Sequence, residues 1–360
     1  MSILLSLLLI LFVYTKPILS TSVTKLVGIN FVAEGFEGPF SYDDPLSLQS
    51  LKDASDIGIT HIVFSFPWYV DNINSTSLPY RVIGGCPTGD PFGNSSSPTD
   101  ASVITAIRAS KALGLNVVLR AMIDPNWNLA VNRQGVSRSD IGKYFGNNKT
   151  KWNEWFDSYN QFVLYWANIA TQEKVDMFCI GAELRSTENQ ETNWRKTFTA
   201  VRNVYSGPVY YSGEGEDITF WDASDYIAQD AYPALTNTTV DPAKVSIADL
   251  VQAWNSTINS LHAQSIKHNK PVLLSETGIC SIDKIGLYNQ PWFFGCYQYP
   301  TDLSVQAAYY ESVFQSIWNR DFIAGVFFWK WSAQGGVLDP TFFPRGKPAA
   351  DVITKYVKNL

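Results

Sequence analysis

The chain has 360 residues, and its 27 Lys and Arg against 33 Asp and Glu give a net charge of −6. No window concentrates Lys and Arg as a phosphate-binding face does, which argues against a nucleic-acid partner. Aromatic residues make up 14% of the chain, and the flat faces of Trp and Tyr suit both a packed core and a sugar-binding cleft.

The first 22 residues have the pattern of a secretory signal peptide. The run from Ile3 to Val13 is apolar except for Ser6, which is too short for the ~20 residues of a membrane span. Small residues follow at Ser20 and Ser22, as at a cleavage site, and a buried N-terminal strand is the alternative. No later apolar stretch is long enough to cross a membrane. Five glycosylation sequons agree with a secreted or lumenal glycoprotein: Asn74, Asn94, Asn148, Asn237 and Asn255.

Short apolar runs alternate with longer amphipathic segments over residues 23–360, the order expected of a parallel sheet with helical crossovers. Segments 54–64 and 109–119 resemble each other, since each has a helix end, a glycine cap (Gly58, Gly114) and a buried strand. The apolar 3.6-residue stripe of the clearest helix, 152–169, predicts core packing. Eight predicted strands begin near Leu26, His61, Val117, Met177, Pro208, Tyr226, Val272 and Gly325.

Eight βα units without an interrupting linker predict an α/β fold, a single-domain (β/α)8 TIM barrel over residues 23–360. An open doubly wound sheet is the alternative, but no G-x-G-x-x-G follows the first strand. Two long connections, 71–100 and 281–301, both follow strands and should rise over the C-terminal face of the barrel. Trp127 and, in the second connection, Trp292 are candidates for the wall of a cleft, with packing as the alternative.

The four cysteines allow three pairings if all are oxidised. Cys280 and Cys296 flank one loop and are the expected disulfide in an oxidising compartment. Cys179 lies in an apolar run, which predicts a buried thiol. Cys86 lies in a Gly- and Pro-containing loop without an evident partner, so its state stays open.

Several catalytic chemistries lack their residues in this chain. There are three histidines, His61, His262 and His268, all in helix or strand patterns, and His61 is expected in the core. The H-E-x-x-H, G-x-S-x-G and P-loop motifs are absent, which argues against a His-rich zinc site and a Ser-His-Asp hydrolase. Carboxylates remain as the candidate reactive groups.

Glu183 ends the fourth predicted strand and Glu276 ends the seventh, where a barrel exposes its C-terminal rim. One such glutamate alone is more often a loop cap or a surface ion pair, but two on facing strands favour a functional pair. Glycoside hydrolysis uses a protonated carboxylic acid and an ionised carboxylate, about 5–5.5 Å apart in retaining enzymes and ~6.5–9.5 Å apart in inverting ones. In a retaining enzyme these two groups carry out both steps, so neither a metal nor an organic cofactor is expected.

Four segments resemble those of glycoside hydrolase family 113, a family of β-1,4-mannanases within the clan of barrel hydrolases that carry glutamates on strands four and seven. They occur in the family's order over nearly the whole mature chain: 178–184 (FCIGAEL), 220–232 (FWDASDYIAQDAY), 270–278 (KPVLLSETG) and 325–331 (GVFFWKW). The resemblance implies a retaining glycoside hydrolase that cleaves a β-linked polysaccharide or oligosaccharide, with endo-β-1,4-mannanase as the first expectation.

The resemblance also implies roles for single residues. Glu183 matches the acid/base and Glu276 the nucleophile. Tyr232 matches a tyrosine that hydrogen-bonds the nucleophile, with packing on Pro233 as the alternative. Trp329 matches the aromatic platform beneath the sugar, with a core tryptophan as the alternative.

Further candidates come from the residues at other strand ends. Arg120 closes the third strand and would hold a carboxylate ionised, contact a sugar hydroxyl or form a structural ion pair. Trp68 and Trp331 are candidate substrate-binding aromatics, with packing as the alternative for each. Two positions depart from the resemblance: Ala182 replaces an Asn common in the clan, and Glu214, a subsite or solvated loop acid, lies where the family tends to have Asn.

Other functions stay open, because the same barrel fold and the same pair of carboxyl groups occur in enzymes that act on different sugars. The rivals are another β-glycanase, acting on β-glucan or β-galactan, an exo-acting glycosidase, and a secreted sugar-binding barrel without catalysis. A monomer is expected. Because the acid/base must stay protonated, an acidic pH optimum is expected as well.

Overall fold

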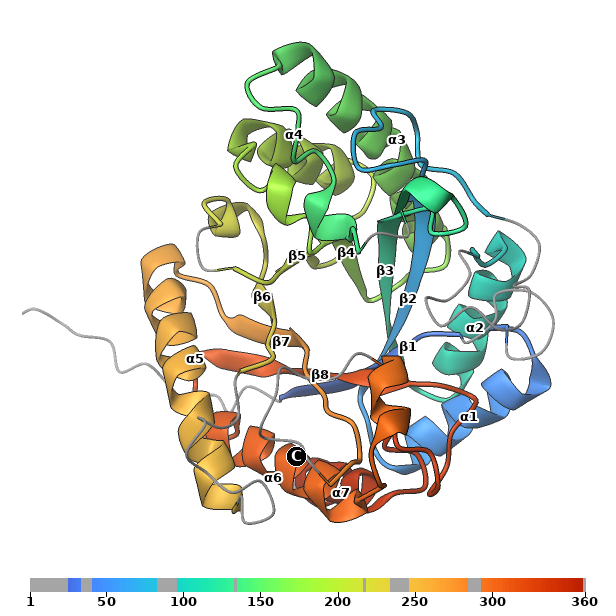
Figure 1. The fold of residues 1–360 in the computed structure, drawn as a ribbon, viewed down its shortest axis with the longest axis vertical. Helices are drawn as coiled ribbons and strands as arrows, with labels where there is room; N and C mark the ends of the chain where they lie inside the picture. The colour runs from blue at the N-terminus through green and yellow to red at the C-terminus, as the bar shows by residue number, and fades with distance from the viewer. Residues whose placement is uncertain are drawn as a thin grey trace, which may run out of the picture.

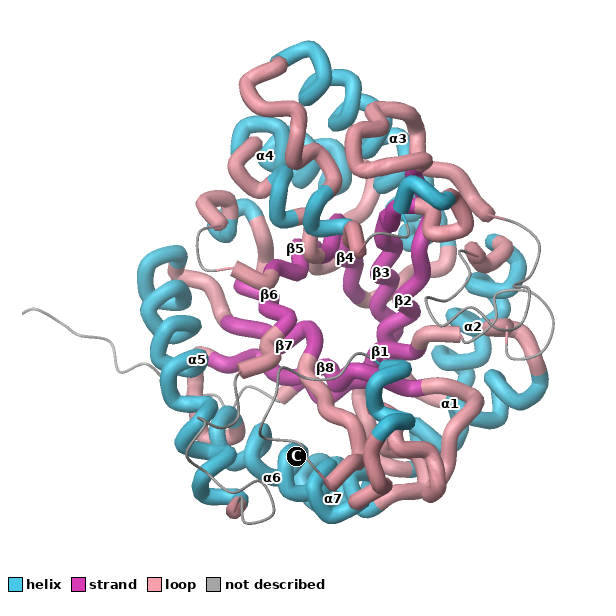
Figure 2. The backbone as a smooth tube through the Cα atoms, in the orientation of Figure 1, coloured by secondary structure: helices cyan, strands magenta, loops and turns pink. Residues whose placement is uncertain are grey.

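In the computed structural model, eight parallel strands close into a barrel surrounded by helices (Figure 1). The structure describes residues 25–33, 41–82, 96–132, 135–215, 218–233, 246–283 and 293–358. The strands pair in chain order, and β8 pairs with β1 to complete the ring that Figure 2 shows in magenta. The predicted (β/α)8 barrel is therefore confirmed.

The expected strands begin at or near the observed ones, and the largest difference is at β8, which starts two residues before Gly325. The strands are β1 (Leu26–Phe31), β2 (His61–Val70), β3 (Asn116–Pro125), β4 (Met177–Ala182), β5 (Val209–Gly213), β6 (Ile227–Asp230), β7 (Val272–Glu276) and β8 (Ile323–Trp331). The helices are α1 (Pro45–Asp56), α2 (Asp100–Ala112), α3 (Lys149–Gln172), α4 (Glu191–Arg202), α5 (Ile247–His268), α6 (Leu303–Ile317) and α7 (Pro348–Val357). None of these helices is long and apolar enough to span a membrane.

The connection from β5 to β6 departs from the expected repeat. Its described residues form only the 3-10 turn Trp221–Ala223, where a regular βα unit has a helix. Phe220 and Trp221 are buried, and the Phe220 ring stacks on Trp194 of α4 at a centroid distance of 5.6 Å. Large aromatic side chains thus cover the barrel at this place instead of a helix.

Side chains along each strand alternate between the barrel interior and the layer under the helices. Cys179 lies among the apolar residues of the interior and is a buried free thiol, as predicted. His61 is buried at the start of β2, also as expected. The aromatic stripe of α3 is buried in the outer layer, as its periodicity predicts. The interior positions closer to the C-terminal end of the barrel are polar: Asn30, Ser65, Arg120, Ser212, Asp230 and Ser275.

Candidate active site

Arg120, on β3, is fully buried at the centre of this polar layer. Its Nη2 lies 2.7 Å from Asp230 Oδ2, and its Nη1 lies 2.5 Å from Glu276 Oε1. The other Asp230 oxygen accepts hydrogen bonds from the hydroxyls of Ser212 (2.7 Å) and Ser275 (2.9 Å). One guanidinium is therefore held between two carboxylates, and the hydroxyls fix the orientation of the pair.

Glu276 ends β7 and is only 5% exposed. Its Oε1 faces Arg120, and its Oε2 accepts a hydrogen bond of 2.9 Å from the hydroxyl of Tyr232, just past β6. Burial raises the pKa of Glu276 well above its usual value, and the charges of Asp230 and Glu183 add to that effect, while the Arg120 guanidinium and the Tyr232 hydroxyl oppose it. Each Glu276 oxygen nevertheless faces a donor, and these two donors stabilise its ionised form.

Glu183 follows β4 and faces the same space. One carboxylate oxygen from each of Glu183, Asp230 and Glu276 lies within 4.8 Å of the other two. The cation nearest to Glu183 is Arg138, whose Nη1 lies 3.5 Å from Oε2, beyond normal hydrogen-bond length. Arg138 instead makes two hydrogen bonds of 2.9 Å to the carboxylate of Asp124. Glu183 therefore has weaker cationic support than Glu276.

The electrostatics favour a proton on Glu183. Burial raises its pKa; the Arg138 guanidinium opposes this, and the neighbouring carboxylate of Glu214, to which Glu183 is hydrogen-bonded, reinforces it. Glu214 follows β5 at the exposed mouth of the barrel, and partial burial raises its pKa too. A hydrogen bond between two carboxyl groups requires one proton between them.

This geometry has a definite chemical capacity. Glu183 and Glu276 offer a proton donor and a carboxylate nucleophile with oxygens no more than 4.8 Å apart. This bound applies to one oxygen of each carboxyl group. It fits the short carboxyl separation of retaining glycosidases, about 5–5.5 Å, better than the ~6.5–9.5 Å of inverting enzymes, where a water lies between the groups.

Glu183, Asp230 and Glu276 are also close enough together to ligate one metal ion. Arg120 already binds two of the three, so its guanidinium supplies the positive charge that a cation would bring. The donor set therefore fits an ion-paired carboxyl site better than a metal centre.

Trp329 lies near the end of β8, half-buried beside the loop that follows β7. Its backbone N–H donates to the carbonyl of Thr277 at 2.8 Å, and its side chain packs on the cluster that contains Phe342 and the disulfide. Gly278 permits this approach, since a Cβ there would overlap the Trp329 carbonyl oxygen. Trp329 is thus placed as a side wall at the mouth of the barrel.

Trp68 is not placed to bind substrate, which corrects the expectation from the sequence. It points outward from β2, and its ring lies 5.3 Å from Phe162 and 6.0 Å from Trp166 of α3. The guanidinium of Arg81 covers the same ring at 4.8 Å. The alternative interpretation, a packing tryptophan, describes this residue.

Trp331 requires the same correction. It is fully buried, and its Nε1 donates to the carbonyl of Ser50 in α1 at 3.1 Å. A register irregularity next to β1 pairs Asn30 with Trp329 but Phe31 with Trp331. Because that irregularity interrupts the alternation, Trp331 packs under the helices although it lies two residues after Trp329.

Two other expected aromatic or thiol positions lie outside the described residues, namely Trp292 and Cys86. Trp127 is half-buried in the β3–α3 connection, where its Nε1 donates to the carbonyl of Val136 at 3.3 Å. Its ring is therefore anchored by its own loop.

Three residues of the site were not predicted from the sequence. Asp230 ends β6 just as Glu276 ends β7, so the strand-end rule could have identified it. Asp124 lies near the end of β3, and the same rule applies to it. Arg138 lies in the β3–α3 connection, where no motif marks it, and only the folded structure brings it to Glu183.

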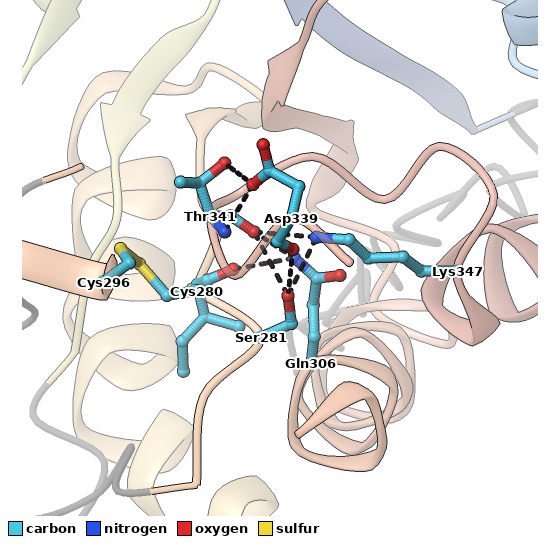
Figure 3. The surroundings of a disulfide bond; sticks show 8 residues. Cys280, Ser281, Cys296, Gln306, Asp339, Thr341 and Lys347 are labelled. Atoms are coloured by element: carbon cyan, nitrogen blue, oxygen red, sulfur yellow. Dashed lines mark hydrogen bonds between the residues drawn. A yellow bond between two sulfur atoms is a disulfide. The ribbon is translucent and has the colours of Figure 1, made fainter. Parts of the chain in front are cut away.

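The predicted disulfide between Cys280 and Cys296 is present and lies beside a buried lysine (Figure 3). Lys347 Nζ donates to Ser281 Oγ at 2.8 Å and to the carbonyl of Thr341 at 3.0 Å, and burial lowers the pKa of Lys347 to about 8. These bonds tie the connection after β7 to the connection after β8. The segments next to Trp329 are therefore held together by buried hydrogen bonds.

Replacing both Cys280 and Cys296 with serine should lower the free energy of unfolding by about 3 kcal/mol. The disulfide closes a loop with a sequence separation of 16, and the loop entropy that it removes from the unfolded chain has about that value. Urea unfolding with and without a thiol reductant measures the effect. The reduced wild type should match the variant, and equal stability of oxidised and reduced wild type would contradict the prediction.

Comparisons with known proteins agree with the barrel fold and show the family. The family model of Glycoside Hydrolase Family 113 matches residues 30–340. A GH113 β-1,4-mannanase solved as a complex has a TM-score of 0.75 and 23% identity, over 92% of this chain and 98% of that one. The GH113 β-mannanase of Alicyclobacillus acidocaldarius has a TM-score of 0.73 and 22% identity, over 94% and 98%. A search of curated proteins found no match.

Proposed function

The chain belongs to glycoside hydrolase family 113, and on that premise we propose that it is a retaining endo-β-1,4-mannanase. Its general class, a glycoside hydrolase, follows from the family. The observation that carries the mechanism is the approach of the Glu183 and Glu276 oxygens to within 4.8 Å, one with a proton to give and the other held by two donors.

In the first step, Glu276 attacks the anomeric carbon while Glu183 transfers its proton to the departing glycosidic oxygen. The bond from the anomeric carbon to the leaving sugar breaks as the ester bond to Glu276 forms. Arg120 and Tyr232 aim the Glu276 oxygens, and their donors favour the anion before attack.

In the second step, Glu183 is a carboxylate and takes a proton from water, and the resulting hydroxide adds to the anomeric carbon. The ester bond to Glu276 breaks, and the sugar leaves with its original anomeric configuration. Glu183 ends the cycle protonated, so the two glutamates complete both steps without a cofactor.

A neutral sugar fits the charges of the site. Glu183, Glu214 and Glu276 face the mouth, while the two arginines near them, Arg120 and Arg138, are already paired with carboxylates. An acidic sugar would meet like charges there. The similar solved structures are β-mannanases, which supports mannan among the neutral β-glycans.

We also propose that the protein is secreted as a monomeric glycoprotein after cleavage of residues 1–22. The exposed side chains of Asn74, Asn148 and Asn255 support this, because a glycan needs an accessible amide. Asn94, Asn237 and the signal segment lie outside the described residues. N-terminal sequencing of the secreted protein and its mass before and after enzymatic deglycosylation test the proposal.

The test of function is incubation with mannohexaose, followed over time by proton NMR and product analysis. Wild type should release short manno-oligosaccharides whose new reducing ends are first β, and Glu276→Ala should release none. First-formed α products would contradict retention. Intact mannohexaose beside cleaved β-glucan or β-galactan would identify another glycanase, and binding without cleavage would identify a sugar-binding barrel.

The pH dependence follows from the proton on Glu183. Activity should fall on the alkaline side as Glu183 deprotonates, at a pH above the usual Glu pKa of about 4.3, because burial raises its pKa. Glu214→Gln removes a like charge and should move this limb to lower pH. Profiles of kcat/KM against pH for wild type and variant measure the shift; coincident alkaline limbs would contradict it.

A further inference from the structure

The backbone of Glu183 has a conformation that its place in the fold does not explain. Among the described residues other than glycine, only Lys174, Glu183 and Asn269 have positive φ, at 52°, 56° and 51°. Lys174 and Asn269 follow helices α3 and α5, where a left-handed residue often terminates a helix. Glu183 follows a strand, where that conformation costs roughly 1–2 kcal/mol. Its surroundings must therefore hold it in place.

Strand β5 holds the two consecutive N–H groups that flank this conformation. The Glu183 N–H donates to the carbonyl of Ser212 at 2.9 Å, as in an ordinary parallel ladder. The next N–H, of Leu184, instead donates to the phenolic oxygen of Tyr211, also at 2.9 Å. The same hydroxyl donates its own proton to Glu188 Oε1 at 2.9 Å. A side chain thus replaces the main-chain partner where the backbone turns.

Tyr211 is suited to this role because it is rigid and stays protonated. It is fully buried on β5, and its ring packs on Trp194 at 4.9 Å and Phe220 at 5.5 Å between centroids. Burial raises the pKa of Tyr211 well above its usual value. The hydroxyl therefore stays protonated. It donates a hydrogen bond to Glu188 and accepts one from the Leu184 N–H.

The carbonyl oxygen of Leu184 is fixed by hydrogen bonds as well. Its oxygen accepts hydrogen bonds from the Thr187 hydroxyl at 2.7 Å and from the Thr187 N–H at 2.8 Å. Trp194 Nε1 in turn donates to the Thr187 carbonyl at 3.1 Å. The Leu184 N–H, in contrast, is held by the Tyr211 hydroxyl, its one hydrogen-bond acceptor among the described residues.

We propose that Tyr211 is a positioning residue for Glu183: its hydroxyl fixes the Leu184 peptide and so keeps Glu183 in the left-handed conformation that directs its carboxyl toward Glu276. The role rests on the proposed function, in which Glu183 is the acid/base. Without the hydroxyl, the Leu184 N–H loses its partner and the Glu183 backbone relaxes toward an ordinary strand conformation. The Glu183 carboxyl then moves away from the leaving oxygen.

Tyr211→Phe removes the hydroxyl alone, and Tyr159→Phe is the matched control. Tyr159 is also buried, and its hydroxyl donates its hydrogen bond to the carbonyl of Ile180 on β4 at 2.5 Å rather than to residue 183 or 184. The substrates are two aryl β-mannobiosides, one with 2,4-dinitrophenol and one with the poorer leaving group 4-methylumbelliferone. Cleavage of the dinitrophenyl bond needs no proton from the enzyme, so the ratio of the two kcat/KM values reports on Glu183 alone.

Tyr211→Phe should lower kcat/KM for the methylumbelliferyl substrate by about 10- to 100-fold, the scale of a misplaced acid, and leave the dinitrophenyl value unchanged. Tyr159→Phe should keep the wild-type ratio. Because both substrates are measured on one sample, a loss of folded protein cancels in the ratio. A Tyr211→Phe ratio equal to that of wild type would overturn the proposal.

Glu183→Gln separates this proposal from the proposed function. If Glu183→Gln changes the ratio strongly and Tyr211→Phe does not, only the positioning role fails. If Glu183→Gln also leaves the ratio unchanged, Glu183 is not the acid/base and both proposals fail. A wild type that cleaves neither mannobioside overturns both as well.

Discussion

Replacing Glu276 with alanine should lower the turnover of mannohexaose by about 10⁴-fold or more, beyond the 10²–10⁴-fold typical of a lost acid or base. The reason is that no other described carboxyl group can form the ester bond in its place. Asp230 is the nearest alternative, but its side chain is buried. One of its oxygens is ion-paired with Arg120, and the other accepts hydrogen bonds from two serine hydroxyls.

Azide distinguishes the roles of the two glutamates. With an activated mannobioside, azide should rescue Glu276→Ala and give the α-azide, because azide enters the cavity left by the side chain on the face opposite the leaving group. It should rescue Glu183→Ala and give the β-azide, because it then attacks the glycosyl ester. Glu154→Ala, at an exposed site on α3, is the control and should keep wild-type turnover. The opposite pattern of azide anomers would exchange the roles of Glu183 and Glu276.

Replacing Arg120 with methionine should lower the free energy of unfolding by about 3–5 kcal/mol, as expected when a buried ion pair loses one partner. Asp230 and Glu276 would both remain in the barrel without their common cation. Chemical unfolding of wild type and variant at neutral pH measures the difference. A loss below about 1 kcal/mol, the value of a surface pair, would contradict the buried arrangement.

The destabilisation in Arg120→Met should also depend on pH. Without the guanidinium, burial raises the folded-state pKa of Asp230 and Glu276 further above their unfolded values of about 3.9 and 4.3. The folded variant then binds more protons than the unfolded chain, so its stability falls as pH rises from about 4 to 7. Adding Asp230→Asn removes one unpaired charge and should recover part of the loss at neutral pH. A pH-independent difference would contradict this account.

The barrel, its strand positions and the two candidate reactive glutamates could be predicted from the sequence. Strand runs and glycine caps are local patterns, so β4 and β7 were found with the glutamates that follow or end them. The buried stripe of α3 follows from the 3.6-residue period in the same way. Cys280 and Cys296 were paired correctly because they flank one short loop.

Which side chains meet in the site depends on how the barrel packs in three dimensions. Arg138 reaches Glu183 from another connection, and no local pattern encodes that approach. A register irregularity separates the surroundings of Trp329, which packs beside the disulfide, from those of Trp331, which packs on α1. The left-handed backbone of Glu183 likewise depends on a hydroxyl from the neighbouring strand. Periodicity assigns residues to elements, whereas distances and directions between elements arise only when the barrel closes and its side chains pack.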